Sequence, residues 1–256
     1  MSLQIRRVVV ALALSLTGAA AASAADGPLS TFAGTIGGFA GDGEPATAAL
    51  LNQPEGMAVA PDGAVLIADA RNHRIRRVAP NGIITTVVGD GTAGLGGDGG
   101  SAFNASLDTP TDVVFAPDGG YFIADSGNHR IRRVAPNGII TTFAGTVQGL
   151  AGDGGPATSA RLDTPREFGP QGDGGLLVVD SANHRIRRIA PDGTITTVAG
   201  TSAGFSGDGG PATSAQLNAP RGVTGTTDGG YLIADAGNHR VRKVDAAGRI
   251  TTVGGT

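Results

Sequence analysis

The sequence of 256 residues contains no cysteine and no tryptophan, and it has only two tyrosines and eight phenylalanines. Without cysteine neither a disulfide framework nor a thiolate metal site can form, so core packing must stabilise the fold. Basic residues are outnumbered as well, because the net charge is −3. An acidic chain with few aromatic residues for base stacking is not expected to bind nucleic acid.

Long apolar runs are also scarce, and the one present lies at the N-terminus. Arg6 and Arg7 precede an apolar segment at residues 8–16, and small residues follow as far as Ala24. This three-part pattern predicts a signal peptide over residues 1–25. The run is shorter than the roughly 20 residues that a membrane span needs. We therefore expect a secreted or periplasmic protein, residues 26–256, with no span after cleavage.

Glycine, in contrast, is abundant with 44 residues, and much of it belongs to an internal repeat. A unit of 55 or 56 residues recurs four times, at about 29–83, 84–139, 140–194 and 195–249, and a last strand follows at 250–254. Turn signals such as Asp62-Gly63 and Asn81-Gly82 divide each copy into four strands. In the first copy we expect these strands at 56–60, 64–68, 74–79 and 83–88. The second strand is apolar on both faces, so neighbouring sheets must cover it.

One polar string, Asp-x-x-Asn-His-Arg, ends the second strand of every copy. It resembles the signature that names the NHL-repeat family. A Gly-rich G-D-G segment also recurs, and it resembles the longer repeat type of teneurins and many bacterial exported proteins. The resemblance implies an all-β fold, a β-propeller of four-stranded blades, and NHL propellers usually have about six blades. The polar string comprises Asp69, Asn72, His73, Arg74, Asp125, Asn128, His129, Arg130, Asp180, Asn183, His184, Arg185, Asp235, Asn238, His239 and Arg240.

Closure of the propeller is left open by the sequence. Residues 29–35 and 250–254 both resemble the outermost strand of a blade. The chain therefore has five outermost strands but only four sets of the three inner strands. A four-bladed ring, which we favour, would leave one terminal strand surplus. An open ring would belong to a longer array or close as a homodimer, since exposed edges favour association.

Residues that recur in all four copies are expected to serve the fold, because a catalytic residue normally occurs once per chain. The polar string is therefore interpreted as turn chemistry, with a ring of four imidazoles binding metal as the alternative. For the G-D-G segment a tight loop with a helical turn after Pro45 is favoured over a calcium site. The basic stripe of Arg74, Arg76 and Arg77 is attributed to ion pairing and solvation.

Positions that break the repeat are the better candidates for ligand binding. They directly precede or begin the first strand of each copy, which lines the axis of a propeller. We expect Glu55, Asp112, Arg166, Glu167 and Arg221 to converge at one mouth of the channel.

These residues favour a non-enzymatic module that binds a protein or a glycan ligand and needs no cofactor. No catalytic residue is assigned, because no nucleophile, base and acid occur together once. The alternative is a metal-dependent hydrolase or lyase, similar to gluconolactonases or the peptide-amidating lyase. Glu55, Asp112 and Glu167 would then hold Ca²⁺ or another divalent cation.

Overall fold

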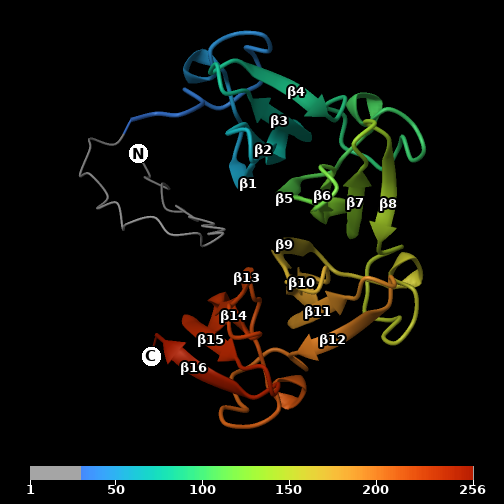
Figure 1. Ribbon diagram of the computed structural model, residues 1–256, viewed down its shortest axis with the longest axis vertical. Helices are drawn as coiled ribbons and strands as arrows, with labels where there is room; N and C mark the ends of the chain where they lie inside the picture. Colours follow the sequence, from blue (N-terminus) through green and yellow to red (C-terminus); the bar gives the residue numbers. More distant parts are fainter. Residues whose placement is uncertain (1–29, 256) are drawn as a thin grey trace.

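The computed structural model describes residues 30–255, and it contains four sheets of four antiparallel strands each (Figure 1). Every sheet takes three strands from one repeat, and its fourth strand is the first strand of the next repeat or, in the last sheet, residues 250–254. The strands follow one another in chain order, and each sheet is called a blade below. Blades 1 and 2 comprise β1 (Pro54–Val59), β2 (Val65–Asp69), β3 (Arg74–Val78), β4 (Ile84–Val88), β5 (Pro110–Phe115), β6 (Tyr121–Asp125), β7 (Arg130–Val134) and β8 (Ile140–Ala144). Blades 3 and 4 comprise β9 (Pro165–Pro170), β10 (Leu176–Asp180), β11 (Arg185–Ile189), β12 (Ile195–Ala199), β13 (Gly222–Gly225), β14 (Tyr231–Asp235), β15 (Arg240–Val244) and β16 (Ile250–Gly254). The all-β architecture of four-stranded blades is confirmed, and the predicted signal peptide lies outside the described residues.

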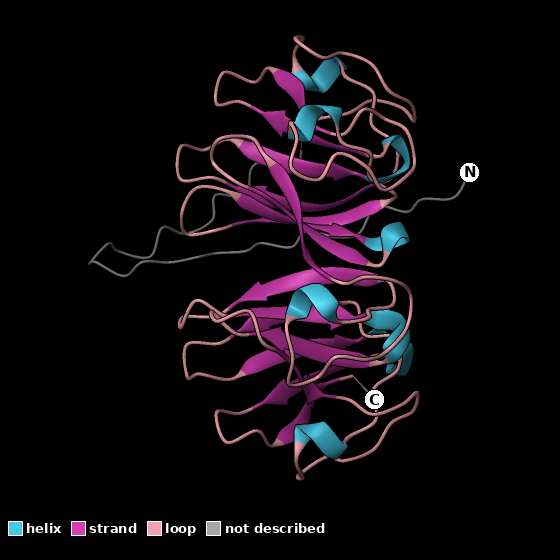
Figure 2. Cartoon of the chain, turned by 90° about the vertical axis from the view of Figure 1, so that its right-hand side faces the viewer, coloured by secondary structure: helices cyan, strands magenta, loops and turns pink. Residues whose placement is uncertain are grey.

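Short 3₁₀ helices connect the strands, and they lie toward one side of the molecule while hairpin loops project from the other (Figure 2). One helix precedes each innermost strand: η1 (Ala46–Ala48), η3 (Ala102–Asn104), η5 (Ala157–Ser159) and η7 (Ala212–Ser214). A second helix joins the second and third strands: η2 (Ala70–Asn72), η4 (Ser126–Asn128), η6 (Ser181–Asn183) and η8 (Ala236–Asn238). The turn expected after Pro45 is η1, and Ser101 replaces proline at the same place before η3. None of these helices is long and apolar enough to cross a membrane.

The blades follow one another around an axis, with β1, β5, β9 and β13 innermost (Figure 1). Strand β1 packs against β5, β5 against β9, and β9 against β13, whereas β13 and β1 make no comparable contact in the described part of the chain. The four blades therefore form an open arc, and the favoured ring that closes within one chain is not formed.

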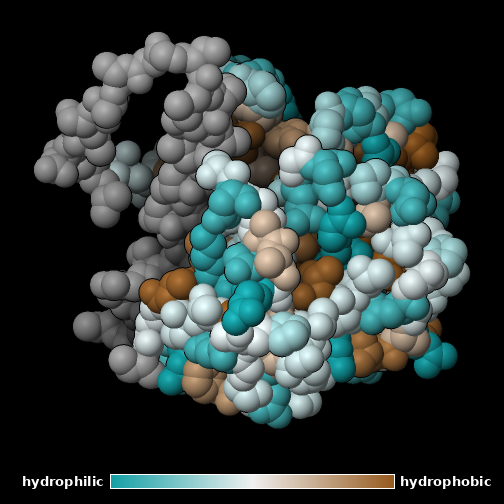
Figure 3. All heavy atoms as spheres, turned by 60° about the horizontal axis from the view of Figure 1, so that its bottom comes forward, coloured by the Kyte–Doolittle hydropathy of each residue, from teal (hydrophilic) through white to brown (hydrophobic). Residues whose placement is uncertain are grey.

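Hydrophobic clusters lie between successive blades and hold this arc together. Between blades 1 and 2, for example, Leu66 and Ile75 pack with Leu107 and Val113. On the face shown in Figure 3, hydrophobic residues form small separate groups. Stability thus depends on contacts between neighbouring blades, as in other repeat folds.

The innermost strand of the third copy is complete, although Gly169 and Pro170 disfavour strand structure. β9 runs over six residues and pairs with β10 despite Gly169 and Pro170. Proline is tolerated at the end of a strand that lines an axis, because its missing N–H interrupts no central ladder. Only β13 is shortened, to four residues.

Candidate functional site

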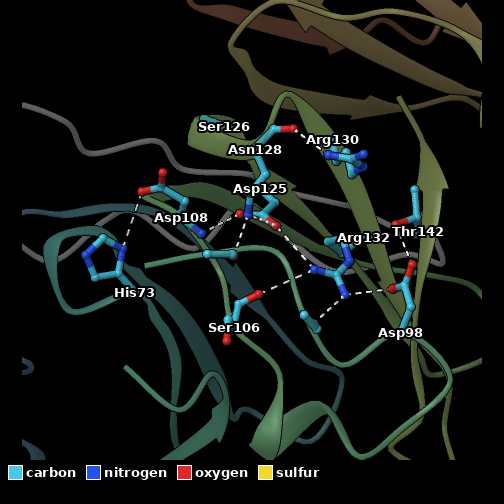
Figure 4. Close-up of polar contacts among 12 residues, drawn as sticks. His73, Asp98, Ser106, Asp108, Asp125, Ser126, Asn128, Arg130, Arg132 and Thr142 are labelled. Atoms are coloured by element: carbon cyan, nitrogen blue, oxygen red, sulfur yellow. Dashed lines mark hydrogen bonds and ion pairs between the residues drawn. The ribbon is translucent and has the colours of Figure 1, made fainter. Parts of the chain in front are cut away.

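The polar string ends the second strand of each blade and fixes the connections around it, as Figure 4 shows for blade 2. Asp125, fully buried at the end of β6, accepts hydrogen bonds from the backbone N–H of Asp108 at 2.7 Å and from Asn128 Nδ2 at 2.8 Å. The same amide group donates to the carbonyl of Gly94 at 2.7 Å. One carboxylate thus holds the start of the inner strand and the Gly-rich loop together. Equivalent bonds recur around Asp69, Asp180 and Asp235.

A buried arginine completes this network, and the sequence did not reveal its burial. Arg132 on β7 has no exposed surface, and it lies 3.4 Å from Asp125 Oδ2 and 2.7 Å from Asp98 Oδ1 (Figure 4). Asp98 is the aspartate of the G-D-G segment. Its carboxylate accepts hydrogen bonds from the guanidinium of Arg132 and from the hydroxyl of Thr142. The arginines of the basic stripe therefore differ in exposure, since Arg132 is buried while the adjacent Arg133 is partly exposed. Arg76, Arg187 and Arg242 are buried in the same way.

The two carboxylates of this network have opposite pKa shifts. Burial raises the pKa of Asp125 to about 6, although hydrogen bonds from Asp108 and Asn128 and the charge of Arg132 oppose the shift. Burial acts in the same direction on Asp98, but there it is outweighed by Thr142 and Arg132, which lower the pKa. The hydrogen bonds from Asp108 and Asn128 and the charge of Arg132 thus favour the ionised form of Asp125, which burial disfavours.

The histidines join successive blades, a role that the sequence analysis missed. His73 Nδ1 accepts a hydrogen bond from the backbone N–H of Thr109, the residue before β5, at 3.1 Å. The corresponding pairs are His129 with Thr164 and His184 with Ala219, at 3.2 and 3.0 Å. The described residues include no group of three or more His, Cys, Asp or Glu side chains that could hold a metal ion.

The residues that break the repeat lie at the starts of the inner strands, near the axis. Glu55 is on β1, Asp112 on β5, and Arg166 and Glu167 on β9, while Arg221 directly precedes β13. Arg166 Nη2 lies 2.9 Å from Glu55 Oε2, so this ion pair connects blades 1 and 3. Both partners are partly exposed, and Arg221 is exposed. The structure thus brings Glu55 and Arg166 together.

Asp112 lies deeper than the other residues of this site. It is 8% exposed, and its Oδ2 accepts a hydrogen bond from the backbone N–H of Phe168 at 3.0 Å. The ladder of β5 with β6 is irregular between Pro110 and Asp112, as it is at the start of β1. Such bulges re-aim side chains at the rim of a sheet. Asp112 therefore points toward blade 3 and caps its backbone.

Glycines in blades 1 and 4 make room for acidic residues in blades 2 and 3. A Cβ atom on Gly56 would lie only 2.1 Å from Asp112 Oδ1 and 2.7 Å from Asp112 Cα. At the corresponding position of blade 4, a Cβ on Gly222 would lie 3.1 Å from Glu167 Oε2. The four inner strands thus present Gly, Asp, Glu and Gly in succession around the axis.

The charges of two other carboxylates act on Asp112. Burial raises the pKa of Asp112 well above its usual range, and the nearby charges of Glu167 and Glu55 raise it further. Glu55 is paired with Arg166, and Asp112 binds backbone, so the expected three-carboxylate cluster is not formed within residues 30–255.

We expect Asp112→Asn to stabilise the protein at pH 7, because burial and the charges of Glu167 and Glu55 disfavour the ionised carboxyl group. The pKa of Asp112 is 3.8 in unfolded protein and higher in folded protein. Between these two pKa values, folded protein binds more protons than unfolded protein. The cost of the charged carboxylate is complete above the folded pKa and vanishes as the pH falls below 3.8. Thermal unfolding followed by circular dichroism should show a gain in Tm at pH 7 that shrinks toward pH 4. Asp118→Asn, on the surface, is the control, and a lower Tm of Asp112→Asn at pH 7 would contradict the assignment.

Four-stranded blades that follow one another around an axis define a repeat β-propeller protein. Residues 37–95 match the family model of the teneurin NHL domain, and residues 107–134 match that of the NHL repeat. Mouse teneurin-1 is 30% identical over 231 residues, and human teneurin-4 is 31% identical over 229 residues. These matches cover 80% and 79% of the chain. The chain is an NHL-repeat protein whose repeats are of the teneurin type. It spans 8% of the length of these relatives.

Solved structures with the same fold are larger than this arc. An auxiliary nutrient binding protein from Bacteroides thetaiotaomicron superposes with a TM-score of 0.58 at 21% identity, over 78% of this chain and 48% of the other. A streptogramin B lyase superposes with a TM-score of 0.53 at 14% identity, over 78% and 53%. At these identities the similarity concerns the fold alone.

Proposed function

We propose that this chain is an exported, non-enzymatic scaffold that binds a protein or glycan ligand at the channel mouth. The observation that carries the proposal is the ion pair of Arg166 with Glu55 near the axis. The exposed Arg221 directly precedes β13, the innermost strand of blade 4. The buried arginines of the four repeats are bonded within their own blades, whereas these charges break the repeat and remain accessible. Export is supported by the N-terminal pattern of basic, apolar and small residues.

The chemistry of the site favours a ligand that carries carboxylates. Arg166 and Arg221 offer planar guanidinium groups, which bind carboxylates through paired hydrogen bonds. A ligand carboxylate could replace Glu55 as the partner of Arg166, while Arg221 supplies a second cation. Ordered backbone beneath the site, held by Asp112 and Phe168, supports a preformed binding surface.

The same fold serves both binding proteins and a lyase, so the choice between them depends on the site. A metal-dependent hydrolase or lyase would need Glu55, Asp112 and Glu167 around one ion. The bonds that Glu55 and Asp112 make to Arg166 and Phe168 favour the binding role instead.

An array of acidic and neutral oligosaccharides and peptides tests the proposal. We expect binding to carboxylate-bearing members, weakened about tenfold or more in the double variant Arg166→Ala/Arg221→Ala, because each lost ionic hydrogen bond costs on the order of 1.5 kcal/mol. The matched control is Arg77→Ala/Arg133→Ala, which removes two exposed arginines from outer strands and should bind normally. Equal weakening in both double variants, or no binding at all, would contradict the proposal.

A further inference from the structure

Each blade contacts its neighbours through two different faces. We call the face that packs on the following blade the leading face, and the face that packs on the preceding blade the trailing face. Between blades 1 and 2, Leu66 and Ile75 belong to the leading face, and Leu107 and Val113 to the trailing face. The same two faces meet in all three internal interfaces, because the repeats are in register.

A histidine hydrogen bond accompanies each of these interfaces. His73 on the leading face of blade 1 binds the backbone N–H of Thr109 on the trailing face of blade 2. Thr109 has a left-handed backbone with φ 47°, and Thr164 and Ala219, the partners of the next two histidines, share this conformation. The internal interface therefore has an apolar part and a polar part.

Within residues 30–255, no other blade packs on the trailing face of blade 1. Met57 is 50% exposed, whereas its equivalents Val113, Phe168 and Val223 are 1%, 6% and 2% exposed. Gln53 has the left-handed backbone of Thr109, with φ 51°, and is also exposed. The trailing face of blade 1 thus has both the apolar part, at Met57, and the polar part, at Gln53, of an internal interface.

The leading face of blade 4 is uncovered in the same way. Val241 is 40% exposed, whereas Ile75, Ile131 and Ile186 are fully buried at the same position. His239 is exposed, and its imidazole makes no hydrogen bond within residues 30–255. Both parts of a leading interface are present at this other end.

We propose that a second copy of this chain docks head to tail, with the leading face of blade 4 on the trailing face of its blade 1. The occupant follows from continuity with the internal interfaces, because the two end faces are the complementary halves of one repeated contact. His239 Nδ1 then accepts a hydrogen bond from the backbone N–H of Gln53 of the second copy. Such a contact uses different faces on the two copies, so it closes a ring or extends an open chain.

One segment must move for this contact to form fully. Gly34 N–H donates to the carbonyl of Ala46 at 2.9 Å, as Gly89 does to Ala102 and Gly145 to Ala157. Residues 30–34 therefore hold the place that the end of a preceding blade would take. On docking, Gly255 of one copy replaces Gly34 of the other at Ala46, and hydrogen exchange at Gly34 becomes faster.

Two charge variants test the head-to-tail geometry by sedimentation velocity. Met57→Glu blocks only the trailing face, and Val241→Glu blocks only the leading face. Wild type should associate at tens of micromolar, and each variant alone should be monomeric. An equimolar mixture of the variants should form a 1:1 dimer, because one copy retains an intact leading face and the other an intact trailing face.

Leu150→Glu is the matched control, since Leu150 is 43% exposed in the Gly-rich loop of an internal repeat. It should associate as wild type does, and circular dichroism should show that all three variants are folded. A monomeric wild type at 100 μM, or a mixture of the two variants that stays monomeric, would overturn the proposal.

Discussion

Replacing Arg132 with methionine is expected to lower the free energy of unfolding by roughly 3–5 kcal/mol, the cost of leaving a buried charge without its partner. The substitution keeps an unbranched apolar stem but removes the guanidinium that faces Asp125 and Asp98. Asp125 is fully buried, and burial already raises its pKa to about 6. Without Arg132 the carboxylate must be protonated or lose its place under the inner strand. Urea denaturation followed by circular dichroism measures the loss.

The neighbouring Arg133 provides the control for this prediction. It pairs with Asp118 at the surface, and exposed ion pairs contribute only about 0–1 kcal/mol. Arg133→Met should therefore be nearly neutral. Adding Asp125→Asn to Arg132→Met should recover part of the stability, because the uncompensated charge is then removed as well. Similar losses for Arg132→Met and Arg133→Met would show that the buried network is not stabilising.

Gly56→Ala is expected to have the second largest effect, a loss of about 1–3 kcal/mol or more from overpacking. The added methyl group would meet Asp112 Cα at 2.7 Å and the carbonyl of Thr111 at 2.8 Å, so backbone rather than a flexible side chain opposes it. Blades 1 and 2 must then separate at the axis. Thermal unfolding measures the loss.

Two other glycines make this a graded series. Gly222 faces the flexible carboxylate of Glu167 at 3.1 Å, which can give way, so Gly222→Ala should cost less than Gly56→Ala. Gly172 has open space around it and no left-handed backbone, so Gly172→Ala should be neutral. If all three variants lost the same stability, the close approach of blades 1 and 2 would not be the cause.

The blades could be predicted from the sequence because local signals repeat. Turn pairs such as Asp62-Gly63 mark the hairpins, and strands expected at 64–68 and 83–88 are observed at Val65–Asp69 and Ile84–Val88. The burial of Arg132 could not be read in this way, because Arg132 and Arg133 are chemically identical neighbours. The Gly-rich loop of the same repeat distinguishes them, because Gly96, Asp98 and Ser106 accept hydrogen bonds from Arg132. A signal was present in the recurrence of this arginine opposite a G-D-G aspartate in every copy.

The sequence could predict that the candidate residues lie near the axis, but not the bonds that they make. Positions that break the repeat identified Glu55 and Arg166, which the structure pairs across the axis. The bond from Phe168 to Asp112, and the space that Gly56 leaves for this acid, depend on the stagger between neighbouring inner strands. Stagger and closure are set by how whole blades stack, and no local pattern in one repeat encodes them.

The histidine link between blades also bears on how such a chain changes in evolution. His73, His129 and His184 make the same bond to the same position of the following blade. Loss or duplication of one complete unit by unequal recombination would therefore join a familiar pair of faces at the new boundary. In an open arc no closure angle limits the number of units, so repeat number can vary while every remaining interface is preserved.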